Sequence, residues 1–231
     1  MATHNPYITP KLFKFFCDLK KNNDREWFEA NKQRYEDDVR TPLLAFIDDF
    51  AEPLYKISPH FRADARKVGG SLLRIFRDVR FSKDKSPYKT QAGVHFRHEN
   101  AKDAHAPGFY LHLEPGEVFL GAGIWHPETA VARQIRAAIL EHPDRWKKAM
   151  KSAAFTKYGY SLAGESLKRP PAGVEKDHPL LDDLKRKDFI AVAERTEKDA
   201  CAPGFPKFFA ERCKSTSAFV RFLSEAVEQP F

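Results

Sequence analysis

Residues 108–125 read GFYLHLEPGEVFLGAGIW, and this stretch decides the fold. Apolar residues recur at every second position on both sides of Pro115-Gly116, and this period of two is typical of β-strands. Proline followed by glycine favours a tight turn. The stretch therefore predicts a β-hairpin with strands over residues 108–114 and 117–125.

Other strands and helices are predicted on both sides of this hairpin. The period of two also predicts strands over residues 71–79, 93–97 and 189–193. Helical periodicity with N-capping residues predicts two or three helices before residue 57, and further helices over 127–141, around Trp146, and over 179–186 and 206–227. Residues 156–177, rich in glycine, proline and lysine, favour a surface loop. We expect one α+β domain over residues 1–231: a largely antiparallel sheet of four to five strands, with N-terminal and C-terminal helices packed on it.

Composition narrows the class of protein. The 231 residues are 42% hydrophobic and 13% aromatic, as in a folded globular chain. Three cysteines without a C-x-x-C spacing favour reduced thiols. The N-terminus lacks a basic region followed by an apolar run, and no stretch of about 18 apolar residues occurs. The sequence therefore predicts a cytoplasmic protein that does not associate with a membrane.

A basic segment precedes the hairpin. Residues 74–90, RIFRDVRFSKDKSPYKT, carry six cations: Arg74, Arg77, Arg80, Lys83, Lys85 and Lys89. Residues 62–102 hold eleven basic and four acidic residues. This excess of seven positive charges equals the net charge of +7 of the whole chain. Arginine and lysine bind phosphate and carboxylate groups, so the segment predicts an anion site, although no P-loop pattern is present.

Two other interpretations of the basic segment remain open. The arginines would be buried within an apolar strand, which requires charged partners, and Asp78 and Asp84 are the nearest candidates. If the arginines are purely structural, the acidic residues of the N-terminal helices would pair with them instead: Asp37, Asp38, Asp48 and Asp49. The lysines would then form only a solvated loop. Alternatively, the same cations would contact nucleic acid along an extended surface.

A second group of candidate residues lies on the hairpin. Tyr110, His112 and Glu114 share one face of a strand, and His112 with Glu114 could form an acid/base pair. If Gly121 and Gly123 of the next strand face the same way, they leave an open floor roofed by Trp125. These residues could equally be structural. Adding His126 would complete a metal set, but this spacing is a weak signal, and no metal site is predicted.

Three stretches carry a resemblance to a known family. They resemble the signatures of an uncharacterised bacterial and fungal family, domain of unknown function 2461. The stretches are residues 22–32, which contain NNDREWF and Asn31-Lys32, residues 74–90, and residues 107–115 with 121–125. The resemblance implies a single domain of this size with a site near these motifs, and it transfers no catalytic residue. Residues 95–106 lie outside the signatures, so their histidines are not predicted to belong to the site.

The function predicted from the sequence is that of a pocket protein that binds a small anionic ligand bearing phosphate or carboxylate. The six cations, Tyr110 and Trp125 would bind the ligand, while His112 and Glu114 would catalyse hydrolysis or group transfer if a reaction takes place. The loop over residues 81–90 is expected near the His112 face, so that both groups form one site. The alternative is a non-enzymatic nucleic-acid-binding module of weak specificity. The sequence identifies neither a cofactor nor an oligomeric state.

Overall fold

The computed structural model describes residues 5–101, 105–150 and 153–231. Its centre is a five-stranded antiparallel sheet in the order β1-β2-β3-β5-β4. The strands are β1 (Ala92–Arg97), β2 (Gly108–Glu114), β3 (Glu117–Ile124), β4 (Ser161–Ala163) and β5 (Phe189–Arg195). The predicted α+β class and the predicted hairpin are therefore confirmed.

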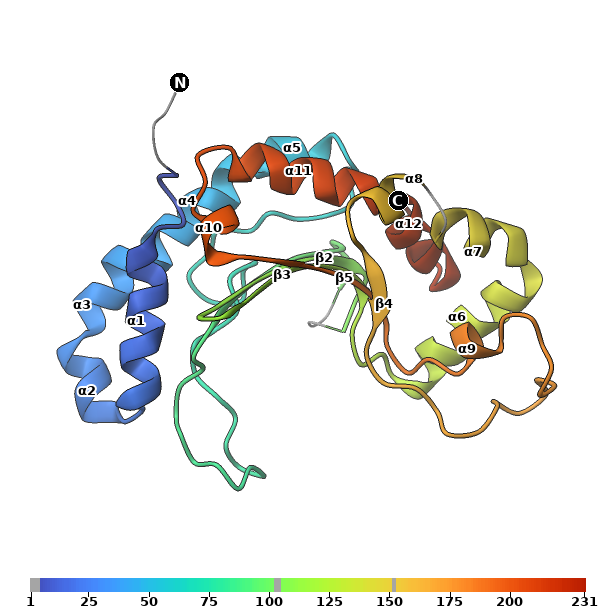
Figure 1. Ribbon diagram of the computed structural model, residues 1–231, viewed down its shortest axis with the longest axis horizontal. Helices are drawn as coiled ribbons and strands as arrows, with labels where there is room; N and C mark the ends of the chain where they lie inside the picture. The colour runs from blue at the N-terminus through green and yellow to red at the C-terminus, as the bar shows by residue number, and fades with distance from the viewer. Residues whose placement is uncertain (1–4, 102–104, 151–152) are drawn as a thin grey trace.

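Helices lie over one face of the sheet and beyond its two sides (Figure 1). The N-terminal group is α1 (Pro10–Lys21), α2 (Arg25–Ala30), α3 (Lys32–Tyr35), the π-helical turn η1 (Glu36–Arg40), α4 (Thr41–Asp49) and α5 (Ala51–Tyr55). The middle group is α6 (Thr129–Glu141), α7 (Pro143–Met150), α8 (Ala153–Lys157) and α9 (Leu181–Leu184). The C-terminal group is α10 (Glu197–Ala200), α11 (Phe205–Ser215) and α12 (Ser217–Ala226). In Figure 1, α5 and α11 cross above the sheet, with α1 to α3 beyond one side and α6 and α9 beyond the other.

The core forms between the sheet and the helices above it. Phe109, Leu111 and Leu113 of β2 are fully buried, and the residues that alternate with them point to the opposite face of the sheet. Phe96 of β1 contacts Phe209 of α11, with ring centroids 5.8 Å apart. The apolar face of the hairpin therefore packs on helices, and the face that carries Tyr110 is not covered by them.

Two regions differ from the sequence-based expectation. The helix predicted over residues 206–227 is two helices, because Thr216 ends α11 and its hydroxyl donates to the carbonyl of Arg212 at 3.2 Å, a bond that competes with helical pairing. The loop predicted over residues 156–177 contains β4, which pairs with β5 at the sheet edge. Three residues are too few for an alternating pattern to reveal a strand.

The strand predicted over residues 71–79 is wrong. These residues run from the edge of β1 into an extended arm, residues 74–90, called the basic arm below, which projects away from the sheet (Figure 1). Isolated bridges join Leu72 to Val94 and Phe76 to Tyr88 in place of a continuous ladder. The arm doubles back on itself and leaves its distal half exposed, where Phe81 is 95% exposed. Residues 71–73 pair with β1, since Leu73 donates to Gly93 and His95 donates to Ser71, but the alternating residues beyond them pair instead with the returning half of the arm.

The N-terminal helices hold the base of the basic arm. The side chain of Asn23 donates to the carbonyl of Tyr88 at 2.9 Å and accepts from the N–H of Tyr88 at 3.1 Å. Phe28 of α2 stacks on the ring of Tyr88 with centroids 4.1 Å apart. Asp24 caps α2 by accepting from the N–H of Trp27 at 2.9 Å. The motif at residues 22–28 therefore fixes where the arm leaves the fold.

Among the residues that the structure describes, no helix has the length and apolar character that crossing a bilayer requires.

Candidate functional site

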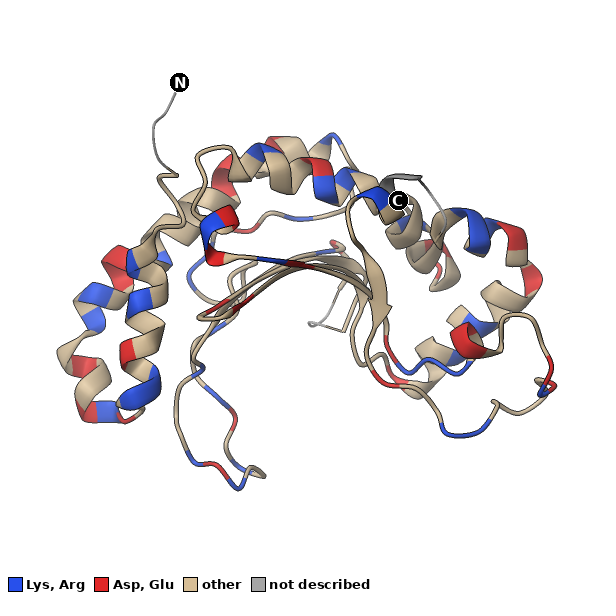
Figure 2. Cartoon of the chain, viewed as in Figure 1, with Lys and Arg blue, Asp and Glu red and all other residues tan. Residues whose placement is uncertain are grey.

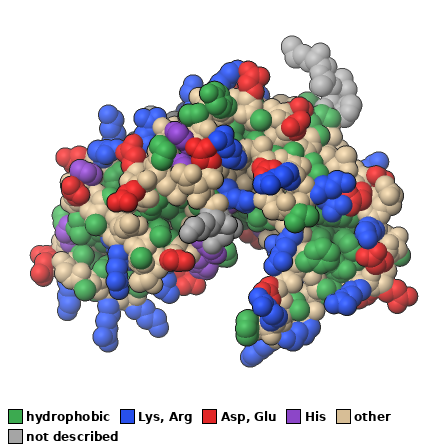
Figure 3. Space-filling model, turned by 180° about the vertical axis from the view of Figure 1, so that it is seen from behind, with side chains coloured by type: hydrophobic (Ala, Val, Ile, Leu, Met, Phe, Trp, Pro, Cys, Tyr) green, Lys and Arg blue, Asp and Glu red, His purple; other side chains and the backbone are tan. Residues whose placement is uncertain are grey.

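A cavity of about 460 Å³ lies on the face of the sheet that the helices leave uncovered. Its lining includes Leu73, Lys89, Gln91, His95, Gly108, Tyr110, His112, Phe119, Gly121, Gly123, Trp125, Ile190 and Val192. Seen from behind, the molecule is hollowed between the side that carries the basic arm and the side that carries α6 and α9 (Figure 3). A wider hollow of about 620 Å³ is bordered by residues 62–66 alone, so no groups from different elements converge there. The cavity on the sheet is the candidate site.

Tyr110 lies flat across the floor of this cavity. It faces Gly121 of β3 across the ladder, and a Cβ placed at Gly121 would lie 3.3 Å from the Tyr110 Cβ. On the other side, a Cβ at Gly93 of β1 would lie 2.5 Å from the Tyr110 hydroxyl. The two glycines therefore give room to one aromatic side chain, a closer packing than the open floor expected from the sequence.

His112 lies beside Tyr110 and is 6% exposed. The Tyr110 hydroxyl is 3.2 Å from Nδ1 of His112, and the ring of Phe119 stacks on the imidazole with centroids 4.4 Å apart. Burial lowers the pKa of His112 below its ordinary value, and this effect exceeds the opposing influence of Glu117 and Glu114, which raise the pKa. The imidazole is therefore neutral at pH 7.

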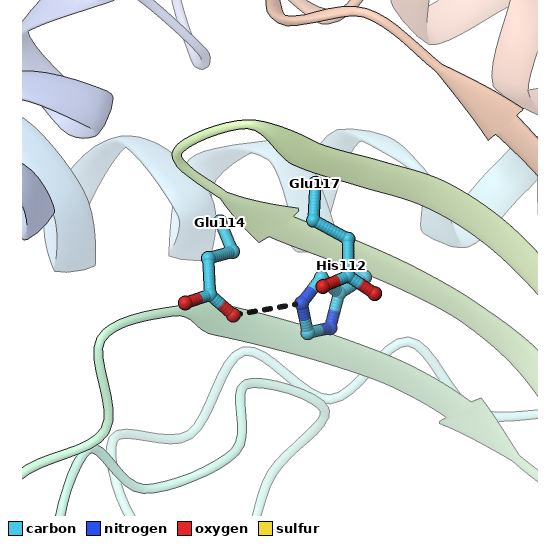
Figure 4. A group of neighbouring side chains, drawn as sticks. All are labelled: His112, Glu114 and Glu117. Carbon is cyan, nitrogen blue, oxygen red and sulfur yellow. Dashed lines mark ion pairs between the residues drawn. The ribbon is translucent and has the colours of Figure 1, made fainter.

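Two carboxylates lie at the end of the hairpin beside His112 (Figure 4). Glu114 is 3.5 Å from Nε2 of His112 and accepts a hydrogen bond of 3.0 Å from the hydroxyl of Thr90. Glu117 is the cross-strand partner of Glu114. One donor atom from each of the three residues falls within 4.8 Å of the others, so His112, Glu114 and Glu117 are the described residues that could hold a metal ion.

Four of the residues predicted from the sequence line this cavity together: Lys89, Tyr110, His112 and Trp125. Glu114 contacts the site through His112. Arg74 lies near Lys89, since its charge helps to lower the pKa of the lysine, although burial is the larger cause. Lys89, at the base of the basic arm, and His112 therefore line the same cavity.

The other cations of the arm are absent from the cavity lining among the described residues. Arg77 forms an ion pair with Asp84, and Arg80 donates to Asp78 at 2.6 and 2.9 Å, so that Asp78 has its pKa lowered to about 2. Acidic residues alternate with basic ones along the arm in Figure 2.

Lys85 donates to the carbonyl of Val79 at 2.9 Å, and Lys83 is exposed. Arg74, expected to be buried, is exposed as well, because the segment is an arm and no interior strand. The acidic residues of the N-terminal helices therefore do not serve as partners of Arg77, which pairs within the arm.

Two polar residues of the lining were missed by the sequence analysis. His95 is 6% exposed and pairs with Tyr110 across β1 and β2. Burial, together with the positive charges of Arg97 and His105, lowers the pKa of His95 to about 4. Gln91 lies just before β1. The alternation over residues 93–97 places His95 on the cavity face, a signal that the resemblance to family signatures led us to set aside.

His126 is separate from the His112 group. Its backbone N–H donates to Oδ1 of Asp188 at 2.8 Å, and its Nδ1 is 2.8 Å from the same oxygen. The other carboxylate oxygen of Asp188 accepts from the N–H of Glu165 at 2.7 Å. His126 therefore takes part in a structural contact between the end of β3, the segment before β5 and the segment after β4, and it completes no metal set with His112 and Glu114.

Comparison with known proteins gives one match. The model of a family described as a conserved hypothetical protein, DUF2461, matches residues 11–222. Neither a search of curated proteins nor a search of solved structures found a match. The matched range includes the Asn23 contact to the arm, the basic arm itself and the hairpin with His112. The chain therefore belongs to the family of domain of unknown function 2461.

Proposed function

We propose that this protein binds a small organic anion in the sheet cavity, with the anionic group held by Lys89. The observation that carries the proposal is the environment of this lysine. Lys89 is half-buried and lines a cavity whose other side chains are largely apolar, and burial and nearby Arg74 lower its pKa. Within the described ranges, no aspartate or glutamate forms an ion pair with Lys89. A partly desolvated cation without a partner gains more from an anion than a cation in water does.

The remaining lining favours a ligand with an apolar or planar body. The cavity that Lys89 lines is also lined by Trp125, Phe119 and Val192. Aromatic and aliphatic walls with a few polar groups are typical of small-molecule sites, and about 460 Å³ lies within their usual size. Phosphate monoesters and carboxylic acids of an aromatic or aliphatic compound satisfy both requirements.

His112 is the residue that favours a hydrolase or transferase over a binding protein. A neutral imidazole can accept a proton from water or from a substrate hydroxyl, and His112 lines the same cavity as Lys89. Tyr110 and Phe119 hold the ring in one orientation. Phosphate-ester hydrolysis or group transfer is the reaction that we propose for this arrangement.

Replacing Lys89 with glutamine tests the binding proposal. We expect the wild-type protein to bind phenyl phosphate, measured by calorimetry and by a rise in melting temperature. The K89Q variant should bind at least tenfold more weakly, because the buried partner of the anion is lost. Inorganic phosphate should bind more weakly than phenyl phosphate, since it lacks a body to contact Phe119 and Trp125.

The matched control is K83Q, which removes the same charge from an exposed position of the basic arm. Its affinity for phenyl phosphate should stay within twofold of that of the wild type. Equal affinities for K89Q and the wild type, or equal losses in K89Q and K83Q, would show that Lys89 does not hold the anion. A panel of aromatic phosphates and carboxylates that fails to bind at millimolar concentration would refute the proposal as a whole.

The nucleic-acid alternative draws on a different observation, the exposed end of the basic arm. Phe81 is 95% exposed there, the guanidinium of Arg80 lies 5.8 Å from its ring centre, and Lys83 is exposed beside it. Cations interleaved with an exposed aromatic ring suit the phosphates and bases of a single strand. Because Arg77 and Arg80 are already paired with aspartates, few cations remain for such contacts.

Any binding of nucleic acid should therefore be weak and sensitive to salt. We expect the affinity for a labelled 20-nucleotide single strand, measured by fluorescence anisotropy, to fall steeply between 50 and 200 mM NaCl, because lysine–phosphate contacts supply it. Sequence changes in the strand should have little effect. A tight and sequence-selective complex that survives at 200 mM NaCl would favour the nucleic-acid function over the anion cavity.

A further inference from the structure

Glu114 and Glu117 place two like charges opposite each other at the end of the hairpin. They are cross-strand partners on either side of the two-residue turn Pro115-Gly116. Like charges that face each other directly across a ladder destabilise the pair. Among the described residues, no lysine or arginine forms an ion pair with either carboxylate. Such a pair is stabilised when the two carboxylates share a cation.

A second observation at the same place points to a ligand. Nε2 of His112 is inaccessible to solvent and has no hydrogen-bond partner. It lies 3.5 Å from the carboxylate of Glu114, which is too long for a good hydrogen bond. A buried polar atom of this kind is rare in native structures, and an ion bound at the site is one of its recognised explanations.

The spacing of the three residues fits shared coordination. Two ligand atoms bound to one Zn²⁺ ion at ordinary N and O distances and a tetrahedral angle lie about 3.4 Å apart. The distance between Nε2 of His112 and the Glu114 oxygen is 3.5 Å, and one atom of each of the three residues lies within 4.8 Å of the others. In Figure 4, the three side chains converge on one point between the strands β2 and β3.

The surrounding groups hold two of these side chains in place. Tyr110 contacts Nδ1 of His112 at 3.2 Å, on the ring nitrogen that faces away from the carboxylates. When Nδ1–H donates to the tyrosine oxygen, Nε2 keeps a lone pair directed toward Glu114, the tautomer that a metal ligand needs. Thr90 donates to Glu114 at 3.0 Å and fixes that carboxylate. Metal-ligating histidines and carboxylates are usually oriented by such outer contacts.

We propose that His112, Glu114 and Glu117 bind a divalent transition-metal ion at the edge of the sheet cavity. One imidazole nitrogen and two carboxylates suit Zn²⁺, Mn²⁺, Fe²⁺ or Co²⁺ better than Ca²⁺ or Mg²⁺, which prefer oxygen ligands alone. Three protein ligands leave coordination positions open, as in catalytic sites. Since His112 lines the cavity, the open positions are available to water or to the anionic group of a ligand. The ion would supply a Lewis acid there, and because it would take the lone pair of Nε2, His112 would then act as a ligand in place of the proton acceptor proposed above.

Metal binding can be measured without any organic ligand. Full-length, tag-free protein is treated with a chelator, dialysed and titrated with ZnCl₂ or MnCl₂ by calorimetry, with the melting temperature as a second readout. We expect one ion per chain and a rise in melting temperature. The E117Q variant should bind at least tenfold more weakly and should keep its fold, because Glu117 is exposed. The H112Q variant should lose the site as well.

Two controls decide whether the three residues form a specific site. Glu197 accepts a hydrogen bond of 2.9 Å from the N–H of Gly116 in the same turn but lies outside the group, so E197Q should bind metal within twofold of the wild type. Equal losses of metal affinity in E197Q and E117Q would mean that the ion is attracted by the negative charge at the hairpin end in general and is not bound by these three residues. Binding with several ions per chain that E117Q leaves unchanged, or no binding at 100 μM metal, would overturn the proposal.

These experiments test the metal site and the anion cavity independently, so one proposal can be refuted while the other stands. The metal titration contains no organic anion, so K89Q should bind the ion as the wild type does. Conversely, loss of phenyl phosphate binding in K89Q would stand even if E117Q had no effect on the metal. If the protein binds the ion but none of the organic anions, the metal site is supported and the proposed function is refuted.

Discussion

Replacing Asp188 with alanine is expected to destabilise the protein by about 3–5 kcal/mol, because two backbone N–H groups lose a charged acceptor and such hydrogen bonds contribute about 1.5–3 kcal/mol each. Asp188 is 1% exposed, and its two carboxylate oxygens accept from the backbone of His126 and of Glu165 and face Nδ1 of His126. Alanine leaves the backbone donors of His126 and Glu165 without this acceptor. A loss of this size is a large part of the 5–15 kcal/mol that stabilises most domains.

Asp188 also holds the backbone at His126 in an unfavourable conformation, so alanine would relieve part of this strain, and the loss should lie toward the lower end of the range. His126 has a φ of 47°, a left-handed backbone conformation that costs free energy for any residue other than glycine. Asp188 holds it there through both the backbone N–H and the ring. Without the carboxylate, the end of β3 and the segment that leads into β5 should separate before the rest of the sheet unfolds.

Urea unfolding followed by circular dichroism measures the change. The control is D182A, because Asp182 is exposed on α9 six residues earlier and should alter stability by less than 1 kcal/mol. D188N should fall between the two, since an amide oxygen can replace one acceptor while its NH₂ group meets a donor on the other side. A D188A protein as stable as D182A would mean that the contact contributes nothing to folding.

The hairpin could be derived from sequence because its information is local. The alternation over residues 108–114 determines which side chains face the helices, and Pro115-Gly116 determines where the chain reverses. The same alternation places Tyr110 and His112 on one face of the strand. Glu117 follows from the same local information, because a two-residue turn places it opposite Glu114 across the ladder, although it was not among the residues predicted for the site.

The basic arm could not be derived in the same way. Its apolar alternation is that of a strand, yet the contacts that shape it come from Asn23 and Phe28, more than 50 residues away in the chain. Which cation reaches the cavity depends on the bridge between Phe76 and Tyr88, and this long-range pairing selects Lys89 among six similar candidates. Net charge identified the segment but could not separate the cation at its base from those paired along its length.

His95 is expected to make the stability of the protein strongly dependent on pH between about 6.5 and 4. Its folded-state pKa is about 4, because burial and the positive charges of Arg97 and His105 disfavour the protonated ring. In the unfolded chain the ordinary value near 6.5 applies. Below pH 6.5 the unfolded state therefore binds a proton that the folded state does not, so the free energy of unfolding falls as the pH falls and levels off for this group below about pH 4. The difference between the two pKa values corresponds to about 3 kcal/mol.

The measurement compares urea unfolding of the wild type and of H95N at intervals from pH 7 to pH 4. Other groups, among them the buried His98 and His112 and the paired aspartates, weaken the fold in acid in both proteins, so the difference between the two isolates His95. H95N should be the less stable protein at pH 7, and its deficit should shrink by about 3 kcal/mol toward pH 4, because only the wild type loses the contribution of the neutral ring. A constant deficit for H95N would mean that His95 is as easily protonated in the cavity as in water, and that the cavity wall beside Tyr110 is open to solvent.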